Sequence, residues 1–229
     1  MTTKTIFENK PLIGHGIYTM PDIAHILQVP YHKVGRWVKE YWDNRLASDF
    51  EGRYSWTDGM ARAIGFHTLI ELFVFLQLSE AGVRTVEVLK AHTELSKLFN
   101  TPYPFATSNI IQKIGTDSRK IYFNEGDDVI FSLDGKKQFN LQFIQDFFKN
   151  VDFSNDALAA RFFPMGKMKS IVVDPEYQFG QPIIHGTNIL PLTISNMYKG
   201  QDPIEFIAEI YEISEVQVKH AIEFCELAA

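Results

Sequence analysis

The chain has 229 residues, of which 45% are hydrophobic and 22% charged, and its formal net charge is −6. This composition is typical of a globular protein with one large or two small cores, and it excludes a chain that is disordered throughout. One cysteine excludes an internal disulfide. We expect neither a membrane span nor a secretory signal, and hence a cytoplasmic protein.

The negative charge is concentrated at one end of the sequence. Residues 1–105 carry 11 basic and 11 acidic side chains, and residues 106–200 carry 10 of each. Residues 201–229 carry seven acids and one lysine, so the whole excess lies there. The charge therefore disfavours nucleic-acid binding by the C-terminal part and leaves the N-terminal part free to bind it.

The segment YTMPDIAHILQVPYHKVGRWVKEYW, residues 18–42, predicts two short helices with a tight connection. Thr19 is a suitable N-cap, Pro21 fits the first turn, and Val29–Pro30 ends the first helix. In the second helix we expect an apolar stripe of Val34, Trp37, Val38 and Tyr41. Two such helices are a candidate helix-turn-helix.

The outer face of the second helix is basic, and no acid occurs between Tyr31 and Lys39. A helix that enters the major groove needs cations for phosphates and side chains that reach base edges. The alternative is an ordinary solvated helix face. The candidate DNA-binding residues are His32, Lys33, Arg36 and Lys39.

The sequence RYSWTDGMARAIGF, residues 53–66, predicts a hairpin directly after these helices. Asp58-Gly59 is a strong signal for a two-residue turn, with strands over 54–57 and 60–66. As a wing, the hairpin would bring Arg53 and Arg62 to phosphate. Alternatively, it only covers the core.

HTLIELFVFLQLSEAGV predicts a helix with a capping box at Thr68-x-x-Glu71 and an end at Gly82. The helix is apolar almost all round, so it is buried in its own domain or against a second copy. Because proteins that read DNA often do so as dimers, we favour burial against a second copy, and hence a homodimer. RTVEVLKAHTELSKLF predicts the next helix, ending at Asn100.

Residues 106–140 predict two or three short strands, broken by Gly126 and by Asp134-Gly135. A short helix follows, with Leu141, Ile144, Phe147 and Phe148 facing inward. The segment ALAARFFPMGKMKS, residues 157–170, combines basic and aromatic side chains, and we interpret it as a linker or a docking segment.

The C-terminal part predicts two short strands and three short helices. The strands are Ile171–Val173 and Ile183–Ile184; Pro182 places the second at a sheet edge, and Gly180 and Gly186 are bends. The helices are predicted to begin near Pro191, at an Asp202 N-cap and at a Ser214 N-cap paired with Gln217. Their acidic surface would repel DNA, so we expect this unit to bind protein.

None of the patterns that mark a catalytic or metal site is present. The seven histidines lack HxxxH and HExxH spacing, no Walker or GxSxG sequence occurs, and Gly14-His15-Gly16 is only half of a dinucleotide fingerprint. We therefore expect a protein that is not an enzyme and uses no cofactor or metal.

Three stretches resemble a known family. Residues 16–38 resemble a MerR-type DNA-reading module, residues 65–83 the helix that follows it in some VapB-type antitoxins, and residues 161–190 with the last helices the antitoxin domain called "domain of unknown function 433". The family often has Arg-Gly-Thr-Arg where this chain has His185-Gly186-Thr187-Asn188, so roles of those arginines do not transfer.

The resemblance implies the antitoxin of a type II toxin–antitoxin pair, which binds a PIN-like ribonuclease toxin with a carboxylate-bound Mg²⁺ and represses its own operon by binding operator DNA. The cationic stretch then suggests that Arg161, Lys167 and Lys169 face the acidic centre of the toxin. The alternative is a free-standing MerR-like regulator whose C-terminal half senses a ligand.

The predicted fold is mainly α with small β elements, in three parts. Residues 1–105 form a MerR-like winged helix-turn-helix domain with dimerising helices. Residues 106–165 form a mixed α/β connection, and residues 166–229 form a three-helix, homeodomain-like antitoxin domain.

Overall fold

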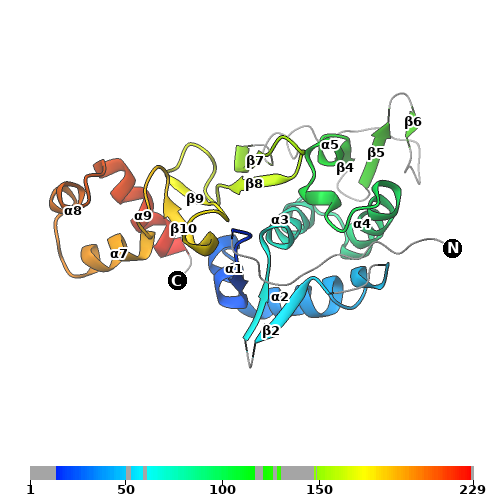
Figure 1. Ribbon diagram of the computed structural model, residues 1–229, viewed down its shortest axis with the longest axis horizontal. Helices are drawn as coiled ribbons and strands as arrows, with labels where there is room; N and C mark the ends of the chain where they lie inside the picture. Colours follow the sequence, from blue (N-terminus) through cyan, green and yellow to red (C-terminus); the bar gives the residue numbers. More distant parts are fainter. Residues whose placement is uncertain are drawn as a thin grey trace.

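A computed structural model describes residues 14–49, 53–58, 61–116, 121–125, 128–129, 147 and 149–227. Over these residues the chain is mainly helical with small β-sheets, as predicted (Figure 1). No helix in this part is long and apolar enough to cross a membrane. The predictions for Asp134-Gly135, Leu141, Ile144 and Phe148 lie outside the described residues.

The two predicted N-terminal helices are present. The first is α1 (Met20–Leu27), which follows the short strand β1 (Tyr18–Thr19). The second is α2 (Tyr31–Arg36), which continues as the π-helix η1 (Trp37–Trp42). Thr19 caps α1 through a capping box in which the Thr19 backbone N–H donates to Asp22 Oδ2 at 2.8 Å. The local signals therefore placed α1 correctly.

The π-helix changes the predicted apolar stripe of the second helix. Val34, Trp37 and Val38 are buried as expected, but the stripe continues with fully buried Trp42, whereas Tyr41 is half-buried. The Asp43 N–H donates to the Val38 carbonyl five residues back, at 2.9 Å. Because a π-turn holds one more residue than an α-turn, it moves the next inward position from Tyr41 to Trp42.

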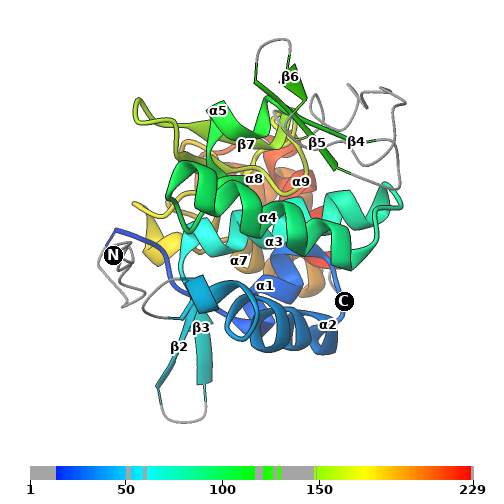
Figure 2. The same ribbon diagram turned by 90° about the vertical axis from the view of Figure 1, so that its right-hand side faces the viewer.

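The predicted hairpin consists of β2 (Ser55–Asp58) and β3 (Ala61–Ile64), with β1 pairing on the other side of β3. Asp58 pairs with Ala61, so Asp58 lies in β2, whereas Gly59 of the predicted turn lies outside the described residues. In both views the hairpin and α2 lie along the same side of the molecule (Figures 1 and 2).

The apolar helix α3 (Phe66–Glu80) is buried by its own chain, next to α4 (Thr85–Phe99). Its Phe75 ring contacts Trp37 and Trp42 of η1, with centroids 5.2 and 5.4 Å apart, and Phe73 contacts Phe162 at 4.7 Å. A second copy is thus not needed to explain why α3 is apolar all round, and the burial of α3 does not indicate a homodimer.

The capping box predicted at Thr68 and Glu71 is wrong. Gly65 is the N-cap of α3 and makes no side-chain cap, while both Thr68 and Glu71 are buried. Glu71 instead accepts hydrogen bonds from a segment more than 30 residues away, because a tertiary partner replaces the local one.

Short elements connect α4 to the C-terminal part. They are 3₁₀ helix η3 (Pro104–Ala106), α5 (Ser108–Ile111), and the antiparallel strands β4 (Ile114–Thr116), β5 (Ile121–Glu125) and β6 (Asp128–Val129). Strands on both sides of Gly126 agree with the predicted break there. Phe147 is helical and buried, as expected.

A four-stranded antiparallel sheet of order β10-β9-β8-β7 follows. Its strands are β7 (Val151–Phe153), β8 (Ala159–Phe162), β9 (Ile171–Val173) and β10 (Pro182–Ile184). The linker interpretation of residues 157–170 is wrong, because β8 is paired on both sides and Phe162 and Phe163 are buried. The sheet also crosses the predicted domain boundary at 165/166, while β9 and β10 confirm the predicted strands and place Pro182 at an edge.

The last three helices are α7 (Pro191–Lys199), α8 (Ile204–Tyr211) and α9 (Glu215–Leu227). They share a core of their own, which includes Ile194, Ile207 and Val218. The capping box of Ser214 and Gln217 is confirmed. The N-cap of α8 is Pro203 and not Asp202, one residue later than predicted.

The N-terminal segment meets the C-terminal part at a close backbone contact. The Ile17 N–H donates to the Phe179 carbonyl at 3.0 Å. Tyr18 is fully buried beside it, and a Cβ on Gly180 would overlap the Tyr18 hydroxyl. Gly180 also has φ +85°, so glycine is required there both for backbone conformation and for space.

Candidate nucleic-acid interface

The predicted DNA-binding cations lie on the exposed side of α2 and η1. His32, Lys33, Arg36 and Lys39 are all exposed, and they occupy the face opposite the buried Val34, Trp37 and Val38 stripe. Because α2 and η1 form one continuous helical segment, they present these charges along a single rod.

These cations have no counter-charge in the part of the chain that the structure describes. Among the described residues, no carboxylate lies within ion-pair distance of Lys33, Arg36 or Lys39, and Arg53 at the base of the hairpin is likewise exposed and unpaired. Water and mobile ions therefore compensate their charge, and an anionic polymer can displace those ions.

Arg62 behaves differently from the other predicted residues. Its guanidinium pairs with Asp43 Oδ2 at 2.5 Å and donates to Ser55 Oγ at 2.8 Å. Asp43 also accepts from the Ser55 backbone N–H at 3.0 Å. Arg62 thus holds the hairpin against the end of η1, and its predicted phosphate contact would require it to leave this network.

The structure adds one cation that sequence reasoning missed. Arg45 follows η1, is exposed, and lies 5.7 Å from the centre of the Tyr41 ring. The spacing of four residues between Tyr41 and Arg45 could have indicated this contact in the sequence, because residues four apart on a helix are neighbours.

Beneath this surface, a buried polar cluster fixes the helices. His92 Nε2 on α4 lies 2.9 Å from Glu71 Oε2 on α3, and Glu71 Oε1 accepts from the backbone N–H groups of Phe105 and Ala106 at 2.8 and 3.1 Å. Burial raises the pKa of Glu71, against the opposing effects of His92 and of the two N–H donors. The cluster joins α3, α4 and η3, and it was not predicted.

The cations predicted to face a toxin are already paired within the chain. Arg161 and Lys167 share Asp152, at 2.9 and 2.7 Å, so these two predicted residues are close together. Lys169 is separate from them, because it pairs with Glu223 of α9 at 2.7 Å. The Asp152 cluster keeps one net positive charge.

Residues 179–189, with the sequence FGQPIIHGTNI, show no catalytic arrangement of side chains. His185 and Asn188 are exposed, and Gly186 has φ +82° in the bend between them. Within the described ranges, no group of three His, Cys, Asp or Glu side chains could hold a metal ion. The stretch instead supplies the edge strand β10 and the contact with Tyr18.

Comparison with known proteins covers the two parts of the chain unequally. Residues 171–225, from β9 into α9, match the family described as "Protein of unknown function (DUF433)", in agreement with the predicted C-terminal resemblance. No curated protein matches the sequence.

Among solved structures, the X-ray crystal structure of Rv2018 from Mycobacterium tuberculosis is similar, with a TM-score of 0.65. The alignment covers 94% of this chain and 100% of that chain at 14% sequence identity. At this identity the likeness shows a shared fold along almost the whole chain.

Proposed function

We propose that the protein is a DNA-binding antitoxin of a type II toxin–antitoxin pair, which binds a PIN-like ribonuclease and represses its own operon. One observation carries the DNA-binding half. Lys33, Arg36 and Lys39 are exposed on one helical rod and have no carboxylate partner among the described residues. Each such cation that meets a phosphate releases a condensed counterion and so favours binding.

In this proposal, residues 14–83 act as a MerR-like winged helix-turn-helix. The helix α2 lies in the major groove with Arg36 toward base edges, and the β2–β3 hairpin is the wing, with Arg53 toward phosphate. Arg62 supports the wing through Asp43 and does not contact DNA itself. A palindromic operator and a homodimer are the expected arrangement.

The proposed partner half is the C-terminal unit, which matches the DUF433 family. Its surface is acidic on α8 and α9, so phosphate would be repelled, whereas a protein with complementary charge would be attracted. Arg161 and Lys167 then exchange their shared Asp152 for carboxylates of the nuclease centre. We propose no catalytic activity, cofactor or resident metal for this chain.

Mobility-shift assays with the DNA upstream of its own gene test the DNA-binding half, beginning at about 50 mM salt, where phosphate contacts are strongest. We expect a discrete complex, displaced by unlabelled upstream DNA before unrelated DNA. Absence of a complex at this salt would rule out the DNA-binding half.

Co-expression with the neighbouring gene tests the partner half. We expect the wild-type chain to abolish toxicity of a neighbouring nuclease, and Arg161→Ala with Lys167→Ala to weaken this protection. The matched control is Arg84→Ala with Lys90→Ala, which also removes two ion-paired cations, but on α4. Full protection by the first double variant would contradict the assigned contact.

A second candidate function is a free-standing MerR-like regulator that senses a ligand. The observation that favours it is a cleft between α1 and the C-terminal unit, which adjoins the first turn of α2. An isolated gene without a neighbouring nuclease would favour this function over the antitoxin.

A further inference from the structure

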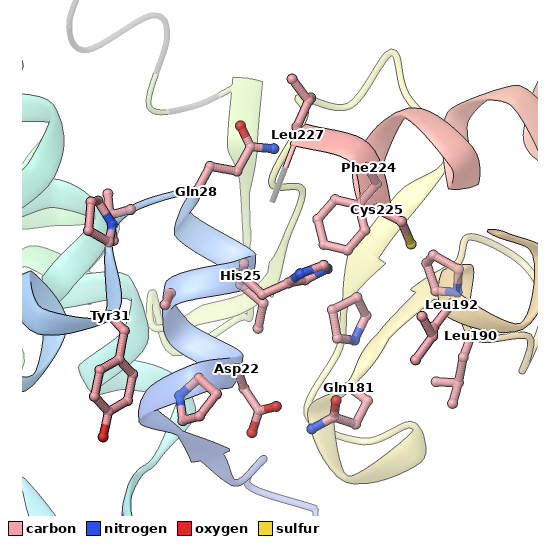
Figure 3. A pocket seen from close by; sticks show the side chains of 17 residues that line it. Asp22, His25, Gln28, Tyr31, Gln181, Leu190, Leu192, Phe224, Cys225 and Leu227 are labelled. Carbon is pink, nitrogen blue, oxygen red and sulfur yellow. The ribbon is translucent and has the colours of Figure 1, made fainter. Parts of the chain in front are cut away.

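A cleft of about 770 Å³ separates α1 from the C-terminal unit (Figure 3). One wall is α1 with the connection to α2, residues 21–31, and the other is built by the start of β10, the start of α7 and the end of α9. This volume is within the range of about 300–1,000 Å³ that is usual for small-molecule sites. None of the DNA or toxin contacts proposed above lies in the cleft.

The lining favours an uncharged ligand. Of the 17 lining residues, none is Lys, Arg or Glu, and the single acid is Asp22. One oxygen of its carboxylate is engaged, because Oδ2 accepts from the Thr19 N–H at 2.8 Å and from Thr19 Oγ1 at 2.6 Å. A charged occupant would lose its hydration; an anion would meet no cation, and a cation would meet only this one, partly engaged carboxylate.

The walls are stiff and apolar. Pro21, Pro30, Pro182 and Pro191 all line the cleft, and a proline ring has a fixed φ and no N–H donor. Leu192 stands at the opening with 57% of its surface exposed. The apolar faces of the proline rings and the exposed leucine suit an apolar molecule that covers them.

His25 supplies a polar contact inside this apolar cleft. Its ring reaches from α1 toward α9 and meets Phe224 edge to face, with centroids 4.7 Å apart and planes at 84° (Figure 3). No described residue makes a hydrogen bond with its ring nitrogens. Burial lowers the pKa of His25, so at neutral pH it is an uncharged imidazole with one donor and one acceptor.

We infer that this cleft binds a small, uncharged aromatic molecule, whose ring lies against the prolines and Phe224 and whose hydroxyl or carbonyl group pairs with His25. The ligand would also touch Tyr31, the first residue of α2. Binding of the ligand in the cleft does not depend on the proposed DNA-binding function. An effect of the ligand on the affinity for DNA would rest on that function.

The probe for the test is 2-naphthol, which is uncharged at pH 7 and fluorescent, titrated with the full chain and followed by anisotropy. We expect saturable binding at one site. The anion 2-naphthoate and the cation 2-naphthylmethylammonium should bind at least about fivefold more weakly, since the cleft lining has no cation and a single, partly engaged acid.

Two variants locate the site. Leu192→Asp places a charge at its opening, and Val86→Asp is the matched control, since both residues are second in their helix and 57% and 56% exposed. An acid in the first turn favours both helices, so both variants should fold. His25→Ala removes the polar contact and should weaken binding about fivefold, in the range of one net hydrogen bond.

Loss of 2-naphthol binding in Leu192→Asp but not in Val86→Asp supports the inference. Equal binding by these two variants, equal binding of the three naphthalene probes, or no saturable binding overturns it. Binding of 2-naphthol by a chain that does not bind DNA would overturn the proposed function and leave the cleft assignment intact.

Discussion

The two ends of the chain carry helical units of similar size, but their cations differ in what surrounds them. On α2 and η1, Lys33, Arg36 and Lys39 have no carboxylate neighbour among the described residues. In the C-terminal part, Arg161, Lys167 and Lys169 are all ion-paired, as is Lys219 with Glu215 one turn earlier. The helical shape of the two units alone would assign them the same kind of partner. They differ in whether their cations are already ion-paired.

The difference follows from where the nearby acids are engaged. No acid occurs between Tyr31 and Lys39. Of the acids four residues after Arg36 and Lys39, Glu40 makes no ion pair with a described residue, and Asp43 pairs with Arg62. In α9 the acid is four residues before the lysine, and in the sheet a single aspartate lies between two cations. A counter-charge that is already supplied within the protein leaves little to gain from phosphate.

The largest expected effect concerns the buried Glu71 carboxyl group, which supports the N-terminal unit. Glu71→Ala removes the partner of His92 and the acceptor of two backbone N–H groups, and we expect a loss of about 3–5 kcal/mol in the free energy of unfolding. Urea denaturation measures it. The control Glu209→Ala removes an exposed acid of α8 and should change stability by less than about 0.5 kcal/mol. Similar losses in both would contradict a structural role for Glu71.

The next effect tests the contact between the two regions. Gly180→Ala and Gly186→Ala share the strain of positive φ, but only the first places a Cβ against Tyr18, since nothing lies within 4 Å at Gly186. We expect Gly180→Ala to cost about 1–3 kcal/mol more than Gly186→Ala, because it overpacks a closed site. Chemical denaturation of both variants gives the difference, and equal losses would refute the close contact.

A smaller effect compares a free cation with a paired one. Arg36→Ala should weaken binding to the upstream DNA by about 1–3 kcal/mol if its guanidinium contacts a base edge. Lys169→Ala, which removes a lysine already paired with Glu223, should leave DNA affinity unchanged. Fluorescence anisotropy at fixed salt measures both, and an equal loss in the two variants would remove the distinction between the regions.

The smallest effect is a pH dependence at the junction of the two regions. His67 of α3 contacts the Ala159 carbonyl of β8 at 3.2 Å, and burial lowers its pKa from 6.5, although that carbonyl acts in the opposite direction. The unfolded state therefore binds more protons below pH 6.5, and stability falls as the solution is acidified from pH 7 toward pH 5. His67→Gln keeps a donor for Ala159 and should flatten that decline in thermal melts; an unchanged slope would exclude this contribution.

Local signals predicted most element boundaries. Thr19 with Asp22, Ser214 with Gln217, and Pro191 at the first position of α7 each define a helix start within four residues of sequence. Sequence reasoning failed where the partner is distant. Glu71 pairs with His92 and η3, and Arg62 pairs with an aspartate 19 residues away, so neither role is visible in a local pattern.

Two further errors have different physical origins. The segment that contains β8 was interpreted as a linker or docking segment because it combines basic and aromatic residues around Pro164 and Gly166. In the structure β8 pairs with β7 and β9, and Phe162 and Phe163 are both buried. Tyr41 was assigned to the apolar stripe on the assumption of α-helical spacing, and the π-helix gave that place to Trp42. The basic face was predicted despite the π-helix, because the cations remain on the exposed side of the helical segment.

The central claim is that the exposed lysines of α2 and η1 bind phosphate. Its most direct test is the affinity of the full chain for upstream DNA as a function of salt, for the wild type and for the variant with Lys33 and Lys39 both changed to alanine. We predict a steep linear loss of log affinity with log salt, with a slope smaller by about 1.8 in the double variant, or about 0.9 for each lost phosphate contact. The same slope in both proteins would contradict the claim.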